Sequence, residues 1–145
     1  MIGEVMGAQR VFADLDGIIA AAHDLSPAWP AVGKVFADRE RRVFTTGQRR
    51  WAPLAAGTLR RKTTGRAVLI NTGGLRADLA NSIPVKSDRK SATCGARTVR
   101  ARKIGTLHRY GTATMPARDP LPPVTGKERA ALLAPIRDHI VGRKH

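Results

Sequence analysis

The chain has 145 residues, of which 42% are hydrophobic but only 4% aromatic, and it carries a formal net charge of +15. This length is typical of one domain, and the composition predicts a modest core of Leu, Ile, Val and Ala. The single cysteine, Cys94, excludes an internal disulfide. The sequence contains no run of 18 consecutive apolar residues, which a membrane-spanning helix would need. We therefore expect a single domain over residues 1–145, made in the cytosol and without a membrane partner.

The charge is unevenly distributed along the chain. Residues 1–33 contain one cation, Arg10, against four acids, whereas residues 34–145 contain 25 cations against seven acids. The first part is therefore acidic, at −3, and the remainder strongly basic, at +18. Such a distribution indicates an acidic partner, which is either nucleic acid or an acidic face of a neighbouring copy.

The N-terminal third predicts two helices. Residues 8–23 carry apolar side chains at helical spacing, and Ser26-Pro27 has the form of an N-cap followed by proline in the first turn of a second helix that runs to about Phe44. The second helix also has a basic face, which is either solvated or in contact with a subunit or DNA. The apolar residues of the first helix are Val11, Phe12, Leu15, Ile18, Ile19 and Ala22, and the basic residues of the second are Lys34, Arg39, Arg41 and Arg42.

After a polar break, Trp51 and Leu54 form apolar anchors on either side of Pro53, whose fixed φ predicts a turn. We expect them to pack against the Leu75 and Leu79 segment. The residues from 57 to 66 offer almost nothing to bury, so they predict an exposed, mobile loop that becomes ordered against an acidic partner. Its candidate interface residues are Arg60, Arg61, Lys62 and Arg66.

The next segment predicts a turn and a short helix. Leu69-Ile70 is either a short strand or one helical turn, and it is followed by Thr72-Gly73-Gly74, which predicts a tight turn. Leu75 and Leu79 stand four residues apart, so we expect a short helix that ends near Asn81.

The period of the apolar pattern changes from Ser82 onward. Apolar residues occupy alternate positions in three short runs (83–85, 92–94 and 99–101), which predicts two or three antiparallel strands. Residues 104–110 predict a further strand or a helical turn, and the prolines from Pro116 to Pro123 exclude regular structure. Thr125 to Val141 again shows helical spacing, with a kink at Pro135. We therefore expect an α+β fold in which N-terminal helices (1–45) and a C-terminal helix and tail (125–145) pack on a small antiparallel sheet with long mobile loops (46–124).

The sequence lacks the groups that an enzyme needs. The four histidines show no metal-binding spacing, one cysteine cannot complete a zinc site, and Gly126-Lys127 lacks the rest of a phosphate-binding loop. We therefore predict no catalytic, metal or cofactor site. Residues 39–109 hold 18 cations against three acids, so non-specific contact with DNA is a real alternative. The few aromatic residues predict no stacking platform, and no sequence-reading motif is present.

Six short motifs occur in an order that resembles the bacteriophage virion-morphogenesis or tail-completion family. The resemblance covers about residues 44–141, and each motif is weak by itself. Two positions depart from the family pattern: Asp119-Pro120-Leu121 stands where the family has Pro-Phe-Leu, and Gly74 is an extra glycine. The motif residues are Trp51, Pro53 and Leu54; Thr58 and Lys62; Leu69; Thr72, Gly73 and Leu75; His108, Tyr110 and Gly111; and Pro116, Ala117 and Arg118.

The resemblance implies a structural virion protein without enzymatic activity. It implies a subunit that forms a ring of six at the neck of the virion, terminates the tail tube and joins it to the head connector or stopper protein, after assembly in the host cytoplasm. A ring needs two different complementary faces on each subunit, and an acidic N-terminal third beside a basic remainder would supply them. The alternative is a basic protein that binds nucleic acid without sequence specificity, and contact between the ring and genomic DNA is left open.

Overall fold

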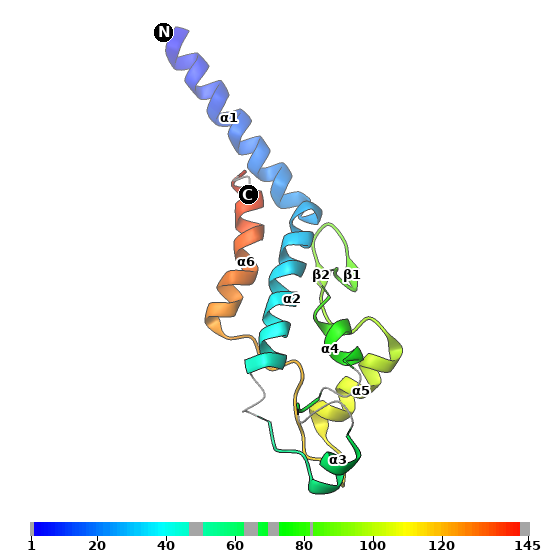
Figure 1. The fold of residues 1–145 in the computed structure, drawn as a ribbon. Helices are drawn as coiled ribbons and strands as arrows, with labels where there is room; N and C mark the ends of the chain where they lie inside the picture. The colour runs from blue at the N-terminus through cyan, green and yellow to red at the C-terminus, as the bar shows by residue number, and fades with distance from the viewer. Residues whose placement is uncertain (1, 47–50, 63–66, 70–72, 82, 143–145) are drawn as a thin grey trace.

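The computed structural model describes residues 2–46, 51–62, 67–69, 73–81 and 83–142, and its side chains from residue 8 onward. Helices and a small two-stranded antiparallel sheet make up this part of the chain, so the predicted α+β class is confirmed. The molecule is elongated: one long helix, α1, extends from one end of a body that contains all the other elements (Figure 1).

The two longest helices of the body, one from each half of the chain, lie side by side. Helix α1 (Ile2–His23) meets a short 3₁₀ turn, η1 (Ser26–Ala28), that leads into α2 (Trp29–Thr46). Helix α2 packs along α6 (Gly126–Ile140), and α6 also touches the last part of α1 (Figure 1). The Thr125 side chain and Glu128 form a reciprocal capping box at the start of α6, which continues through Pro135 to Ile140. The C-terminal helix is therefore confirmed.

The sheet is a hairpin of β1 (Lys86–Ser87) and β2 (Ala92–Thr93), with Lys86 opposite Thr93. The Asp88 carboxylate accepts hydrogen bonds from the backbone N–H groups of Lys90 and Ser91, which fixes the turn. The hairpin holds the corner between α1 and α2: the Trp29 indole N–H donates to the Asp88 carbonyl at 2.6 Å, and the Leu25 N–H donates to the Arg89 carbonyl at 2.8 Å.

Three further helices form the other end of the body. They are α3 (Ala56–Arg61), α4 (Gly74–Leu79) and α5 (Val99–Tyr110). The Asp78 carboxylate of α4 accepts hydrogen bonds from the backbone N–H groups of Arg97 and Thr98, so it fixes the start of α5 against α4. Thr98 caps α5 by accepting a hydrogen bond from the Ala101 N–H.

The core lies between helices and is small. Phe44 of α2, Leu75 and Leu79 of α4 and Ala101 of α5 form the buried cluster. Partly buried side chains complete it from the connecting segments: Trp51, Leu69, Ala96, Ile104 and Leu121. The low aromatic content predicts this modest size.

Three local predictions from the sequence are wrong. Residues 99–110, expected to include strands, form helix α5, because Ala101 and Ile104 face the core at helical spacing behind the Thr98 cap. Residues 57–61 of the expected mobile loop are helical, in α3, and residues 63–66 lie outside the described chain. Ser26 forms no side-chain cap; its own N–H is instead bound by the Asp24 carboxylate at 2.9 Å.

Candidate functional site

A buried arginine joins three of the motifs. Arg118 is only 5% exposed, and its guanidinium donates hydrogen bonds to the carbonyl groups of Ala52 and Pro53, at 2.7 and 2.8 Å. Its backbone N–H donates to the His108 carbonyl at 2.6 Å. The planar guanidinium can donate to two carbonyl groups at once. The structure thus brings together the segments around residues 52, 108 and 118, which are far apart in the sequence.

Trp51 attaches this corner to the core. Its indole N–H donates to the Asp119 carbonyl at 3.1 Å, and its ring meets Phe44 edge-on, with centroids 5.8 Å apart. Trp51 also packs against the cluster that contains Leu75 and Leu79, so that prediction is confirmed for Trp51. Leu54 is half-buried and lies outside the cluster. The aromatic residue, rather than the leucine, is therefore the anchor of the segment.

Gly111 permits the sharp exit from α5. Its φ is +73°, and its N–H donates to the Leu107 carbonyl at 2.9 Å. A Cβ atom at this position would lie 2.8 Å from the Met115 carbonyl oxygen, so a side chain would clash as well as strain the backbone. Pro116 follows as an exposed residue. Tyr110 is 74% exposed, and its ring lies 5.7 Å from the Arg109 guanidinium carbon.

The surroundings of His108 favour the neutral form of its side chain. Its ring is half-buried, and loss of solvation, followed by the nearby charge of Arg118, lowers its pKa. No group of three or more His, Cys, Asp or Glu residues that could hold a metal ion occurs within the described ranges. The geometry of the corner is that of a structural joint.

The remaining predicted motif residues lie around α4. Gly73 precedes α4 with φ +79°, and Leu75 is buried in the core. Thr72 is outside the described residues. Arg60 and Arg61 of the candidate interface are exposed on α3, and the Arg61 side chain donates to the Gly57 carbonyl at 3.2 Å. Lys62 reaches back to the Ala67 carbonyl, and Arg66 lies outside the described residues, so Arg60 and Arg61 are the exposed residues among the three that the structure describes.

One arginine of α2 lies inside the protein instead of on the basic face that the sequence predicts. Arg39, predicted on a solvent-exposed or partner-binding face, is 3% exposed and forms an ion pair with Glu40, which is completely buried. Arg39 also donates to the carbonyl groups of Pro122 and Pro123, and its Nε lies 3.3 Å from the Glu128 carboxylate. Burial raises the Glu40 pKa to about 7, against the opposing effect of Arg39. The sequence contains a signal for the burial of Glu40, because Glu40 stands at helical spacing between Phe36 and Phe44 on the apolar stripe.

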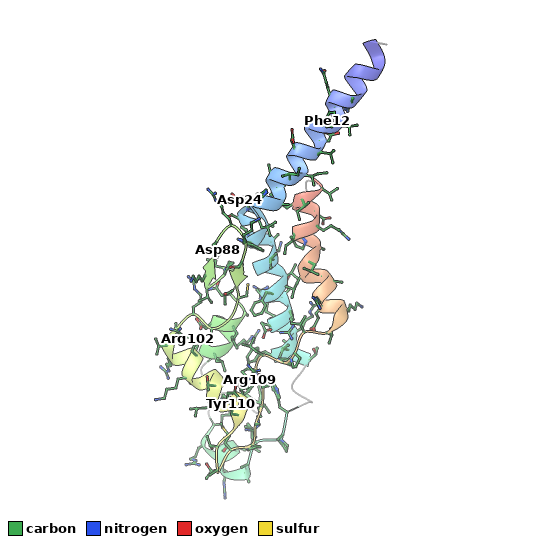
Figure 2. The ribbon with its side chains drawn as sticks, turned by 180° about the vertical axis from the view of Figure 1, so that it is seen from behind. Phe12, Asp24, Asp88, Arg102, Arg109 and Tyr110 are labelled. Carbon is green, nitrogen blue, oxygen red and sulfur yellow. The ribbon has the colours of Figure 1, made fainter. Side chains whose placement is uncertain are left out.

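Helix α1 has an exposed apolar face. Every side chain from residue 8 to residue 20 is exposed, including a stripe of large hydrophobic residues. Their exposed fractions are 57% for Val11, 65% for Phe12, 48% for Leu15, 41% for Ile18 and 54% for Ile19. Figure 2 shows Phe12 on the projecting part of α1, well away from the labelled residues of the body. We call these five residues the α1 stripe.

A shallow apolar groove lies in the body between α4, β2 and α5. Its volume is about 420 Å³, and α5 supplies one wall, with Arg102 and Arg109 among the lining residues. Arg109 lies 3.7 Å from Asp119, and Arg102 is exposed to solvent. The apolar lining comes mainly from Leu75, Leu79, Val85, Ala101, Pro120 and Leu121. We call this feature the α5 groove.

Comparison of the chain with protein-family models, with curated proteins and with solved structures found no match. A search of the described residues found no helix long and apolar enough to cross a membrane.

Proposed function

We propose that this chain is a structural subunit of a bacteriophage virion. In this role it assembles into a ring at the head–tail junction, terminates the tail tube and provides a docking surface for the head connector. The observation that carries the proposal is the α1 stripe, which leaves five large hydrophobic side chains exposed on a projecting helix. A contiguous exposed apolar face of this kind marks a site of association.

The stability of α1 supports the same conclusion. In proteins, most helical stability comes from packing of an apolar face against another surface rather than from the intrinsic propensity of the residues. Only the last part of α1 meets the body, through α6, and Lys90 donates to the Ala22 carbonyl at 2.9 Å. The free part of the helix therefore gains its packing from another molecule.

The corner around Arg118 supports the family resemblance on which the proposal depends. The Trp-Ala-Pro, His-Arg-Tyr-Gly and Pro-Ala-Arg motifs are separated by more than 50 residues at their extremes, yet hydrogen bonds and packing unite them in one structural unit. A resemblance based on motifs that contact one another in one structural unit is more specific than a resemblance based on short matches at unrelated places.

The first test is the mass of the purified protein in solution, measured by analytical ultracentrifugation at low and high salt, with electron microscopy of the same samples. The proposal predicts a discrete ring. A protein that stays monomeric at all accessible concentrations contradicts it. A second measurement, mass spectrometry of purified virions, asks whether the chain is present and in how many copies.

Non-specific binding of nucleic acid is the second candidate function. It is favoured by helix α5, which exposes Arg100, Arg102, Lys103 and Arg109 and contains no acid. Clustered cations of this kind release counterions from DNA at any sequence. Fluorescence anisotropy with duplex DNA tests it: tight binding by a monomer, with a steep loss of affinity as salt rises, favours this function over ring assembly.

A further inference from the structure

We propose that the α1 stripe of one subunit docks into the α5 groove of the next subunit. The inference rests on the proposed ring assembly and specifies its interface. It commits to a second copy of this chain as the partner, in a head-to-tail arrangement.

The first argument is the position of the two surfaces. Helix α1 extends from one end of the body, whereas α5, with its residues Arg102 and Arg109, lies toward the other end (Figures 1 and 2). The corner between α1 and α2 is held by the hairpin and by α6, where the His139 ring lies 2.8 Å from the Asp24 carbonyl. Because α1 points away from the body, a subunit cannot fill its own groove.

The second argument is charge. On a helix with 3.6 residues per turn, Asp14 and Asp16 fall at the two margins of the α1 stripe, and the α1 sequence contains three acids against Arg10 alone. The α5 groove carries the opposite charge: Arg102 and Arg109 of α5, a helix that contains no acid, are among its lining residues. Asp119 also lines the groove, but its carboxylate already accepts a hydrogen bond from the Leu121 N–H and faces Arg109. Opposite charges at the edges favour this pairing over contact between two acidic α1 helices.

The third argument is the form of the groove. It passes Gly105 of α5, where a Cβ would lie in ordinary van der Waals contact with Leu75 and Pro120, at 3.9 and 4.0 Å. Its floor consists of buried side chains, among them Leu75, Leu79 and Ala101, and its volume of about 420 Å³ is the space that side chains of a docked helix would enter. Docking an amphipathic helix in an apolar groove is a common mode of recognition, with anchors at helical spacing. Phe12, Leu15 and Ile19 have this spacing.

The arrangement also determines the type of assembly. Each subunit carries one helix and one groove at different places, so the contact is heterologous and continues from copy to copy until a ring closes. Pairing of α1 with α1 would instead be isologous and would stop at dimers.

The lone cysteine allows a direct test, because Cys94 is half-buried in the wall of the groove. We would introduce one cysteine at a time into the full-length protein (Phe12→Cys, Leu15→Cys or Ile19→Cys), oxidise the assembled protein, and separate the products by non-reducing electrophoresis. A disulfide forms only if the two Cβ atoms come within about 4.5 Å. The expected result is a ladder of dimers, trimers and larger species for at least one of the three variants.

Matched controls identify the bond. Ala13→Cys places the thiol on the opposite face of α1, and the Cys94→Ser change removes the partner, so neither should give a ladder. Arg102→Glu should lower the association constant about two- to fivefold, the effect of a partly exposed ion pair. Arg100→Glu, outside the groove on the same helix, should have a smaller effect.

Three outcomes overturn the inference. Crosslinks that persist without Cys94 and stop at dimers show α1–α1 pairing. Crosslinks to Cys94 that stop at dimers show a reciprocal exchange instead of a head-to-tail chain. A ring seen by ultracentrifugation without any crosslink to Cys94 leaves the proposed function standing and refutes this interface, whereas a monomer refutes the proposed function itself.

Discussion

Gly111 is the residue at which the corner between α5 and the Pro116 segment is most sensitive. The change Gly111→Ala should lower the free energy of unfolding by about 2 to 3 kcal/mol, because φ of +73° is strained for a residue with a side chain and the new Cβ would meet the Met115 carbonyl oxygen. Urea denaturation measures the change. Gly57→Ala is the control: Gly57 is helical, with open space at its Cβ, so this variant should be as stable as the parent or more stable.

Glu40 should make stability depend on pH. Its pKa is about 7 in the folded protein, against an ordinary value of 4.5 for a solvated glutamate, so the folded state keeps a proton that the unfolded state has lost. The stabilisation is complete below pH 4.5 and disappears as pH rises to 7. Since one pKa unit corresponds to about 1.4 kcal/mol, the parent should lose up to about 3 kcal/mol over this range relative to Glu40→Gln.

The comparison with Glu40→Gln is needed because other groups act in the opposite sense. The pKa of Glu128 is lowered by hydrogen bonds from Thr125, and that of His108 is lowered by burial, so both contribute stability that is lost as pH falls. Thermal denaturation of both proteins between pH 4.5 and 8 isolates the Glu40 effect. Asp38→Asn, which removes an exposed carboxylate from the same helix, is the control. Parallel pH profiles for Glu40→Gln and the parent would refute the assignment.

At the scale of elements, Trp51 links the segment after α2 to the core. Trp51→Ala should lower the free energy of unfolding by about 3 kcal/mol, at the low end for aromatic residues because the ring is only partly buried. Trp51→Phe keeps the edge contact with Phe44 but loses the hydrogen bond to the Asp119 carbonyl, so its cost should be smaller. A Trp51→Ala protein that unfolds at the same urea concentration as the parent would contradict the role of the anchor.

Helix α1 should be separable from the stability of the body. Deletion of residues 1–16 removes most of the α1 stripe but leaves Ala22 and Asp24, through which the corner contacts the hairpin and α6. We expect the melting temperature of the subunit to change little while assembly is lost, as measured by calorimetry and ultracentrifugation. The double variant Phe12→Ser, Leu15→Ser keeps the length of the helix and should lose assembly in the same way.

The sequence predicted some elements well because their signals are local. Pro27 marks the turn into α2, Thr125 and Glu128 mark the start of α6, and Gly73 marks the start of α4. Helix α5 was mistaken for strand because Val99 and Ala101 alternate with cations, whereas the Thr98 cap and the spacing of Ala101 and Ile104 carried the correct signal.

The joint at Arg118 and the burial of Arg39 could not be predicted from local patterns. Arg118 serves carbonyl groups of residues 52 and 53, and Arg39 serves those of residues 122 and 123, so both depend on pairs more than 60 residues apart. An arginine reads as solvent-exposed unless its distant partners are known. The α1 stripe was found by its periodicity, but its exposure follows from the direction in which α1 leaves the body (Figure 1).

At the scale of the whole molecule, the acidic start and the basic remainder should control how fast copies associate. Attraction between opposite charges raises the association rate and is screened over about 10 Å at 0.1 M salt. We expect the association rate to fall steeply as the salt concentration rises. It can be followed by light scattering after monomers are mixed into buffers of different salt concentration. The dissociation rate should change less, because the apolar contact of the α1 stripe is not screened. Equal salt dependence of both rates would contradict this division.

The order of α1 and the α5 groove along the sequence has a consequence for biosynthesis. Residues of the α1 stripe leave the ribosome well before residues 75–121, which build the α5 groove. A nascent chain therefore exposes its α1 stripe before its own α5 groove has been synthesised. The grooves available to it at that stage belong to finished copies. Subunits translated on the same messenger RNA can thus be captured in the order of their synthesis, and growth of the assembly acquires a direction from translation itself.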